Sequence, residues 1–575
     1  MSSELGGDKT MQSSVVEPSS DTAEQGSELS SEAENVREEV LSDVRDWFET
    51  ANREELHGFD APDETFLSDS FFEFSYLDGR TEVERYWVNK PFAYVSVLED
   101  ETRQQHSYHV NEPVLDTFEQ HVRADLIQTI RNRLMYRDIT ADRDTRRAVF
   151  DAELDSILST HAATVEDGSV QKLRYYLVRD FIDFGRLDPL MRDEAIEDIS
   201  CDGTDVPVFI YHQGYRDLRT NISFGAEKLN SLVVRLAQWA GKHLSISDPL
   251  IDASLPDGSR IQLTLGGDVT SRGSNFTIRK FSDVPLTPVD LIRENTFSVE
   301  EMAYLWLCIE NNRSLVFAGG TGAGKTTSLN AVSFFIPPES KVVSIEDTRE
   351  IVLPHENWVQ SLTRDAVAGR GDIDTYRLLQ TALRQRPEYL LVGEIRTDQR
   401  VALTFFQAIS TGHTCYTTVH ADTVDAVLSR LQNPPLSVPT QMLSELDIIS
   451  IQKQVARGTE RHRRNQTLAE LTTDGSGGVS PHPVFKRDAT TDRHEQVAES
   501  QVVQDIAELH GWTTKRVASE LESRERVLAY LIDEDITDYT EIAAVIHTFQ
   551  RNPEYVMARI DGGDLSPELL TGELQ

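Results

Sequence analysis

The stretch that most constrains how this chain can fold is GGTGAGKTT, residues 319–327. It fits the pattern G-x-x-x-x-G-K-[ST], follows the apolar, β-rich run SLVFAG and opens the helix-like run KTTSLNAVSFF. Glycines let backbone N–H groups curl around a phosphate, and the N-terminus of the following helix adds a favourable dipole. We therefore expect a strand, a phosphate-binding loop (P-loop) and a helix in succession, which together cradle the phosphates of a nucleotide.

The P-loop pattern assigns candidate roles to individual residues. Lys325 is expected to reach the β- and γ-phosphate oxygens, and the Thr326 hydroxyl is expected to bind Mg²⁺. The expected ligand is ATP with Mg²⁺, and the expected reaction is ATP hydrolysis. The residues expected to bind the nucleotide are Gly319, Gly320, Thr321, Gly322, Ala323, Gly324, Lys325, Thr326 and Thr327.

An alternation of helices and strands surrounds the P-loop and predicts an α/β fold. Strands that alternate with helices at this spacing imply a parallel sheet covered on both faces. The expected helices span 299–311, 325–335, 374–385, 398–410 and 423–431, and the expected strands span 314–318, 341–346, 388–393 and 414–418.

Composition and pattern divide the rest of the chain. Residues 1–40 hold ten acidic residues, nine serines and no aromatic residue, so we expect a disordered acidic tail there. Pattern changes and breaks rich in proline or glycine predict the other boundaries. They give an N-terminal helical or mixed subdomain at 41–165, a mixed α/β N-terminal domain at 166–283, the P-loop domain at 284–475, and a linker with a helical C-terminal extension at 476–575.

Two candidate catalytic carboxylates lie at expected strand ends. Glu346 is in KVVSIEDTREI, and Glu394 is in RPEYLLVGEIR. Carboxylates at the carboxyl ends of strands beside the P-loop strand can reach the γ-phosphate and its metal. Glu394 can hold Mg²⁺ through water or polarise the attacking water. Glu346 competes for the general-base role, and the sequence does not separate the two; a solvated acidic loop is the alternative for Glu346.

Histidines and arginines complete the candidate site. His413 and His420 flank the last expected strand, within STGHTCYTTVHAD. A single histidine is usually a satisfied polar group, but either ring here can contact the γ-phosphate or a subunit interface. Arg260, Arg272 and Arg279 precede the P-loop domain. Phosphoryl transfer gains from an arginine that meets the charge developing on the γ-phosphate, although ordinary surface arginines are the alternative.

Taken together, these motifs resemble the type II/IV secretion-system ATPase superfamily, whose members drive assembly of type IV pili, secretion pseudopili and the archaellum. The P-loop, the acidic box SIEDTREI, the Walker-B form RPEYLLVGEIR and the His box TGHTCYTTVHA stand in the order of that family. The phrases GRLDPLMRDEAIEDISCDG and NPPLSVPTQMLSELDIISIQKQ resemble its archaeal branch. The resemblance covers residues 165–475 well and residues 41–165 weakly.

This resemblance implies a RecA-like P-loop domain in a homohexameric ring, with ATP bound between subunits. It implies a motor that powers assembly of a pilus-like filament, or secretion, through a membrane-embedded platform protein; an archaellum motor is the alternative. The site residues that it implies are Lys325 and Thr326 in Walker A, Glu346 and Glu394 as the carboxylates, His413 and His420 in the His box, and Arg260 and Arg279 as arginines near the nucleotide.

The net charge of −40 restricts the partners. A chain this acidic is repelled by nucleic acid at low salt, which argues against the remaining alternative, a RecA-like nucleic-acid motor. No apolar run approaches the roughly 18 residues that span a bilayer, and residues 1–20 show no apolar core typical of a secretory signal. We expect a cytoplasmic protein that meets the inner face of the membrane through partners.

The same charge favours a source that lives in high salt. Surface carboxylates hold water, and their mutual repulsion is screened when the Debye length falls to about 3 Å at 1 M salt. We expect the free energy of unfolding to rise with KCl concentration, as measured by circular dichroism in a denaturant series at each salt level. Full stability without added salt would contradict this expectation.

Overall fold

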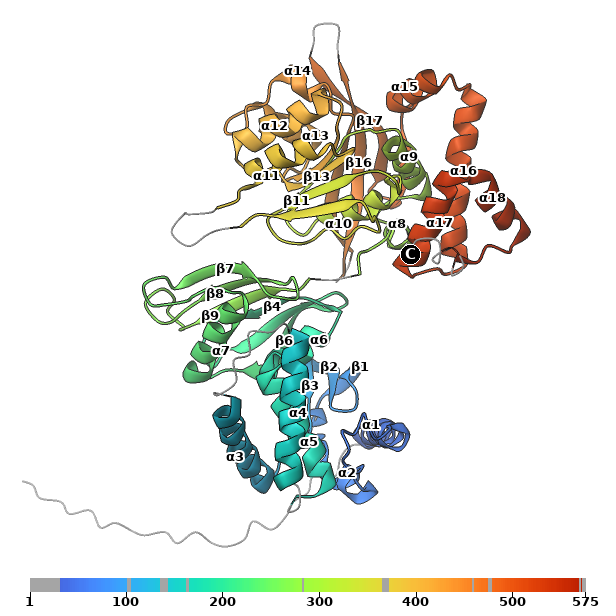
Figure 1. Ribbon diagram of the computed structural model, residues 1–575. Coiled ribbons are helices and arrows are strands. Elements are labelled where there is room, and N and C mark those ends of the chain that lie inside the picture. Colours follow the sequence, from blue (N-terminus) through green and yellow to red (C-terminus); the bar gives the residue numbers. More distant parts are fainter. Residues whose placement is uncertain are drawn as a thin grey trace, which may run out of the picture. The chain divides into compact units, whose positions relative to one another are not determined.

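The computed structural model describes residues 31–100, 105–134, 143–161, 165–281, 284–364, 372–457, 460–473, 478–567 and 570. The chain divides into two compact units. Unit 1 is Met1–Asn230 with Gly266–Asn275, and unit 2 is Ser231–Leu265 with Phe276–Gln575. Figure 1 shows the elements of each unit in colours that follow the sequence.

Unit 1 is mixed α/β, as predicted. Strands β1, β2 and β3 pair antiparallel in succession, β3 pairs parallel with β6, and β5 pairs antiparallel with both β6 and β4. Its strands are β1 (Thr81–Asn89), β2 (Ala93–Asp100), β3 (Gln105–Asn111), β4 (Ile196–Cys201), β5 (Pro207–His212) and β6 (Arg216–Ser223). Its helices are α1 (Ser31–Thr50), α2 (Glu64–Ser70), α3 (Thr117–Leu134), α4 (Arg143–His161), α5 (Asp167–Phe181) and α6 (Asp188–Arg192), and α7 (Ala226–Trp239) begins here and ends in unit 2.

The first helix corrects one prediction about the acidic tail. Helix α1 begins at Ser31, so the expected disorder is wrong for residues 31–40. Ala33, Val36 and Val40 are buried and belong to a core cluster with Phe71. Their spacing of three and four residues puts them on one helical face, and this apolar stripe offsets the acidic composition. Residues 1–30 of the predicted tail lie outside the described residues.

Unit 2 contains the P-loop and a nine-stranded sheet in the order β12-β11-β13-β14-β10-β15-β16-β17-β18. Pairing is parallel from β12 to β15 and antiparallel from β15 to β18. The strands are β10 (Leu315–Gly319), β11 (Val342–Glu346), β12 (Trp358–Leu362), β13 (Tyr389–Glu394), β14 (Thr414–Val419), β15 (Ile448–Arg457), β16 (Glu460–Thr473), β17 (Val479–Asp488) and β18 (Arg493–Gln496). Further strands are β7 (Leu250–Ser254) and β8 (Arg260–Thr264), which form an antiparallel hairpin, and β9 (Asn275–Arg279).

Both faces of this sheet are covered. Together with the parallel pairing from β12 to β15, this confirms the predicted parallel sheet with two covered faces. Along β10, Leu315 and Phe317 join one core cluster, whereas Val316 and Ala318 join the other. Strands buried on both faces read as continuous apolar runs, as SLVFAG does. In Figure 1 the helices α9 and α10 lie on one side of the sheet and α11, α12 and α13 on the other. The helices of this part are α8 (Pro288–Arg293), α9 (Val299–Glu310), α10 (Lys325–Val332), α11 (Thr375–Ala382), α12 (Gln399–Ser410), α13 (Val424–Gln432) and α14 (Thr440–Leu443).

The sheet continues past residue 475, where the P-loop domain was predicted to end. Strand β17 pairs with β16 from Val479 to Lys486, so the predicted linker is wrong for this segment. The prolines of VSPHP suggested a break. Pro481 and Pro483 occupy the part of β17 that precedes its pairing with β18, where that side of the strand needs no N–H donor. Residues 474–477 lie outside the described residues.

The C-terminal extension is helical, as predicted, and it packs on the P-loop domain. Its helices are α15 (Gln501–His510), α16 (Thr514–Asp533), α17 (Tyr539–Arg551) and α18 (Pro553–Gly562). Leu528 and Ile546 belong to the same buried cluster as Trp306 of α9. Arg524, itself buried, forms an ion pair with Glu310 at the end of α9. The extension therefore shares the hydrophobic core of unit 2. No helix in the described parts of the chain is long and apolar enough to cross a bilayer.

A buried carboxylate holds the start of this extension. Glu470 of β16 accepts hydrogen bonds from the Tyr304 hydroxyl at 2.8 Å, from the Ser500 hydroxyl, and from the backbone N–H groups of Gln501 at 2.8 Å and Val502 at 3.2 Å. Its side chain thus joins α9, β16 and the first turn of α15. Since it is only 1% exposed, water cannot replace a lost partner.

Glu470→Gln should lower the free energy of unfolding by about 1–3 kcal/mol, because an amide replaces one acceptor oxygen with a donor and leaves a buried N–H without a partner. Urea unfolding followed by fluorescence measures the change. Glu495→Gln, at an exposed position of β18, is the matched control and should leave the stability unchanged. Equal stability of the two variants would contradict the proposed role of Glu470.

Candidate functional site

The P-loop connects β10 to α10 as the sequence predicts. Strand β10 ends at Gly319 and helix α10 begins at Lys325. Gly322 and Gly324 adopt φ angles of +72° and +88°, a left-handed backbone that favours glycine. A Cβ at Gly319 would lie 2.4 Å from the Gln452 carbonyl oxygen, so only glycine fits where β10 lies beside β15. The residues predicted from sequence to bind the nucleotide run without a break from the end of β10 through the loop into the first turn of α10: Gly319, Gly320, Thr321, Gly322, Ala323, Gly324, Lys325, Thr326 and Thr327.

Lys325 points back into this loop. Its Nζ donates a hydrogen bond to the Gly320 carbonyl oxygen at 2.9 Å and lies 3.4 Å from His420 Nδ1. Burial lowers the pKa of Lys325, although the carboxylates of Glu394 and Glu350 oppose this effect. The cation is thus held at the loop by a backbone oxygen and nearby negative charge.

His420 and Glu394 extend the line of side chains that starts at Lys325. His420 follows β14, and its Nε2 lies 3.0 Å from Glu394 Oε1 at the end of β13. Glu394 Oε2 accepts a hydrogen bond from Arg396 Nε at 2.8 Å. The structure therefore brings Lys325, His420 and Glu394 together because β10, β13 and β14 are parallel and present their carboxyl ends at one edge.

His413 lies at the other end of β14, before Thr414. Its Nδ1 lies 3.3 Å from both the Thr411 hydroxyl and the Ala408 carbonyl oxygen. His413 lines a cavity of about 540 Å³ together with Asp447 and with residues just before β10, such as Arg313. The two histidines of the His box are thus separated by the length of a strand, and only His420 is beside the P-loop.

Glu346 is buried at the end of β11 and organises the loop that follows it. Its Oε1 accepts backbone hydrogen bonds from Glu350 and Ile351, both at 2.9 Å, and its Oε2 lies 3.4 Å from Gln360 Nε2. Burial raises the pKa of Glu346 to about 7, although these hydrogen bonds oppose the rise. One of its two oxygens is therefore already committed to the backbone.

The candidate arginines precede the P-loop domain: Arg260 and Arg279 lie on strands, and Arg272 lies in the turn between them. Arg260 of β8 donates to both oxygens of Asp252, at 3.2 and 3.0 Å, and this hydrogen bonding raises its pKa. Arg279 of β9 is exposed and lies 4.0 Å from Glu350. Arg272 is also exposed, and its backbone oxygen accepts from the N–H of Thr204. The structure places none of the three guanidinium groups in a hydrogen bond with the P-loop residues that it describes.

Two arginines at the site were missed by the sequence reasoning. Arg396 was quoted as part of RPEYLLVGEIR without a role, yet it pairs with Glu394 and lies 3.3 Å from Asp347. Arg463 lies in the phrase RHRRNQTLAEL, residues 461–471, which also resembles the archaeal branch but carries no predicted role at the site. Its Nε donates to the Gly322 carbonyl oxygen at 3.4 Å. No local pattern marks it, because more than a hundred residues separate it from the P-loop.

The residues present fit a magnesium–nucleotide complex. The left-handed glycines and the N-terminus of α10 form an anion-binding turn. Glu394 Oε1 is buried and makes no well-oriented hydrogen bond to the described residues, although His420 Nε2 is nearby. The oxygens of Thr326 and Glu394 are of the kind that Mg²⁺ prefers. These observations support a binding site for a nucleotide with Mg²⁺.

The fold and this site define a RecA-like P-loop domain, and comparison with known proteins identifies the family. The chain belongs to the type II/IV secretion system protein family, whose model matches residues 194–534. A second model, described as PilB3-like, N-terminal, matches residues 47–114. This membership confirms the resemblance that the motifs indicated.

Individual proteins and one solved structure are similar to parts of this chain. An uncharacterized protein of Methanocaldococcus jannaschii is 38% identical over 385 residues, which cover 66% of this chain and 69% of that protein. Protein VirB11 of Agrobacterium fabrum is 32% identical over 195 residues, 29% of this chain and 55% of VirB11. The crystal structure of the VirB11 ATPase from the Brucella suis type IV secretion system is 24% identical and covers 51% of this chain and 95% of its own, with a TM-score of 0.25.

The raised pKa of Glu346 predicts a pH-dependent stability. Between an unfolded pKa near 4.5 and the folded value of about 7, the folded protein binds the proton more tightly than the unfolded chain. The free energy of unfolding should therefore fall as pH rises through this window, by about 1.4 kcal/mol for each unit of pKa difference. Urea unfolding at several pH values should show this slope reduced in Glu346→Gln. Glu356 is exposed in the segment between β11 and β12, so the control Glu356→Gln should keep the wild-type slope. Parallel pH profiles for wild type and Glu346→Gln would refute the prediction.

Proposed function

We propose that this protein is an ATP-hydrolysing hexameric motor that powers assembly of a type IV pilus-like filament, or secretion, through a membrane platform protein. The observation that carries the proposal is the line of side chains at the P-loop. Lys325 Nζ lies 3.4 Å from His420, and His420 lies 3.0 Å from Glu394. A cation, a histidine and a carboxylate at the carboxyl edge of a parallel sheet suit the binding and hydrolysis of a nucleoside triphosphate.

Each residue of this line has a distinct proposed task. Backbone N–H groups of the P-loop bind the phosphates, and Lys325 leaves the Gly320 oxygen to contact the β- and γ-phosphate oxygens. Thr326 and Glu394 would hold Mg²⁺, which would neutralise negative charge on the bound phosphates. His420 lies between Lys325 and Glu394 and senses the occupancy of the γ-phosphate position.

Glu394 is the better candidate for the general base. Its Oε1 belongs to the same line of side chains as Lys325 and has no well-oriented hydrogen bond to the described residues. Glu346 Oε1 already accepts two backbone N–H groups. We therefore assign Glu346 to ordering the acidic box and Glu394 to polarising the attacking water. His413, at the opposite end of β14, is assigned a structural role.

Arg260 and Arg279 are proposed to contact the nucleotide in the assembled homohexamer. The ion pairs that Arg260 and Arg279 form in this structure are weak enough to be exchanged for contacts with a nucleotide phosphate. The Arg260–Asp252 pair is solvent-exposed, and the Arg279–Glu350 pair is separated by 4.0 Å. Exposed ion pairs of this kind contribute only about 0–1 kcal/mol, so replacing a carboxylate with a more highly charged phosphate costs little.

The family supports a proposal for the wider setting of the motor. Membership of the type II/IV secretion system protein family, similarity to VirB11 and the match to the PilB3-like N-terminal model support a secretion or pilus machine. A cytoplasmic motor that is peripherally bound to the inner face of the membrane through a platform protein fits the absence of a spanning helix among the described residues. An archaellum motor remains the second candidate, because the same motifs serve it.

Lys325→Ala should abolish ATP hydrolysis by weakening nucleotide binding, whereas Glu394→Gln should retain nucleotide binding and lose about 100-fold or more in turnover. Phosphate release and the fluorescence of a labelled ATP analogue measure the two effects separately, in buffer with high KCl. Lys341→Ala, which removes a partly exposed lysine just before β11, is the control and should behave as wild type. Normal turnover by Lys325→Ala would disprove the site assignment.

The same assay distinguishes the motor from a nucleic-acid enzyme. Membranes that contain the platform protein should stimulate ATP hydrolysis, because they couple the ring to its load. DNA should have no effect, since a net charge of −40 disfavours contact with phosphate backbones. Strong stimulation by DNA alone would instead favour the nucleic-acid motor.

A further inference from the structure

Arg463 on strand β16 contacts the P-loop from outside the four sequence motifs. Its Nε donates to the Gly322 carbonyl oxygen at 3.4 Å. Its hydrocarbon stem runs along Gly324, since a Cβ placed there would lie 3.1 Å from Arg463 Cδ. A charged side chain more than a hundred residues away therefore lies against the two left-handed glycines of the loop.

The contact has a direct effect on the loop backbone. In a trans peptide the C=O and the following N–H point in opposite directions. An arginine that holds the Gly322 oxygen on the outside of the loop therefore turns the Ala323 N–H toward the inside, where it lies 3.4 Å from the Gly320 oxygen. Lys325 Nζ also donates to the Gly320 oxygen. Two donors thus converge inside the turn that receives the phosphates.

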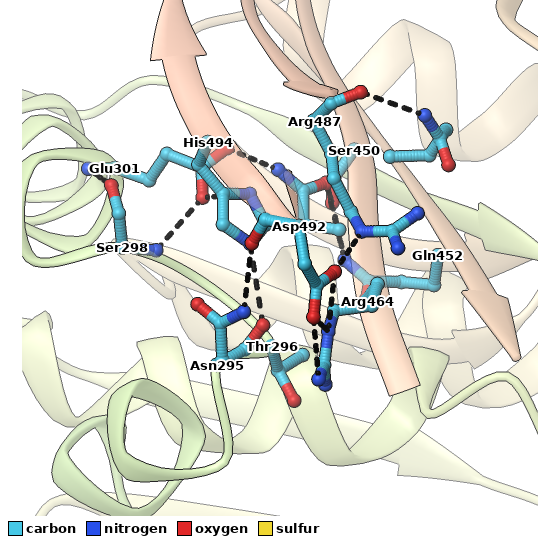
Figure 2. Close-up of polar contacts among 12 residues, drawn as sticks. Asn295, Thr296, Ser298, Glu301, Ser450, Gln452, Arg464, Arg487, Asp492 and His494 are labelled. Carbon is cyan, nitrogen blue, oxygen red and sulfur yellow. Dashed lines mark hydrogen bonds and ion pairs between the residues drawn. The ribbon is translucent and has the colours of Figure 1, made fainter. Parts of the chain in front are cut away.

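A buried ion-pair network fixes the strand that carries Arg463. The next residue, Arg464, is 5% exposed and donates to both oxygens of Asp492, at 3.2 Å from Nε and 3.1 Å from Nη2. Arg487 Nε donates to the same carboxylate at 2.5 Å. Figure 2 shows Asp492 with Arg464 and Arg487 as its partners. The two arginines hold the pKa of Asp492 far below its usual value despite the opposing effect of burial, so the carboxylate stays charged.

Asn465, the residue after Arg464, anchors β16 to helix α9 and to β15, the strand beside β10. Asn465 is fully buried and donates to Glu301 Oε1 at 2.7 Å, and it accepts from the Ser450 hydroxyl at 3.0 Å. Glu301 Oε2 lies 3.0 Å from His494 Nδ1, a pair also visible in Figure 2. Gln452 pairs with Asn465 across the hairpin and with Gly319 of β10. The backbone of Arg463 is therefore held in register with the P-loop.

We propose that Arg463 is a positioning residue for the phosphate-binding loop, which orients the Gly322–Ala323 peptide and adds positive charge beside the di- or triphosphate of the bound nucleotide. This inference rests on the proposed nucleotide site. A purely structural arginine would stabilise the fold with or without nucleotide. A positioning residue acts on phosphate binding while leaving the nucleotide-free protein unchanged.

Arg463→Met, which keeps the length of the stem and removes the charge, should weaken binding of a fluorescent ADP about tenfold, as expected for loss of one charge-assisted hydrogen bond. Arg463→Lys should lose less, because the charge remains while the planar donor geometry is lost. The KM for ATP should rise more than kcat falls. The unfolding temperature without nucleotide should stay at the wild-type value for both variants.

Arg461→Met is the matched control. Arg461 lies on the same strand, two residues nearer the hairpin turn, and its guanidinium donates to Gln454. ADP affinity within twofold of wild type for Arg463→Met, or an equal loss in Arg461→Met, would overturn the inference. A fall in the nucleotide-free unfolding temperature that accounts for the weaker binding in both Arg463 variants would overturn it as well. A wild-type protein that binds no ADP would instead overturn the proposed function, and this inference with it.

Discussion

The close packing of β10 between β14 and β15 is the constraint on which the site depends. Gly319 lies against the Gln452 backbone so tightly that no side chain fits, and this contact sets where the P-loop begins. Parallel pairing with β14 then brings His420 to the loop, and β13 brings Glu394 to His420. A shift of one residue in this register would move each of these side chains to the opposite face of its strand or away from the loop.

Buried charge connects the P-loop region to the rest of unit 2. Glu470 joins β16 to α9 and α15, and the Arg464–Asp492 pair joins β16 to the connection between β17 and β18. Breaking such pairs is costly, because a single charge would remain in a water-free interior. The C-terminal helices are part of this arrangement, since Arg524 pairs with Glu310 and lies over the ring of Trp306. Their contacts make them a component of the domain core rather than an appended module.

Much of this fold could be predicted because its central strands are short apolar runs bounded by turn residues. The strand expected at 414–418 is Thr414–Val419, and the helix expected at 398–410 is Gln399–Ser410. The predictions for α1 and β17 were wrong for the same reason, because they relied on local composition and not on tertiary packing. The acidic residues around α1 concealed an apolar face, and the prolines of β17 suggested a break in a strand that the sheet accommodates. In both places a tertiary partner supplies the stabilisation that local composition does not show.

The sequence by itself determined the chemistry of the site: a glycine-rich loop with Lys325, carboxylates at Glu346 and Glu394, and histidines around a strand, in an order specific enough to indicate the family. Only the tertiary structure decided which of these residues meet. It placed His420 beside Lys325 and His413 at the far end of the strand, engaged Glu346 with backbone N–H groups, and brought Arg463 onto the P-loop. The physical reason is that a motif records local spacing, whereas proximity across a sheet depends on strand register and on the packing of segments far apart in the chain.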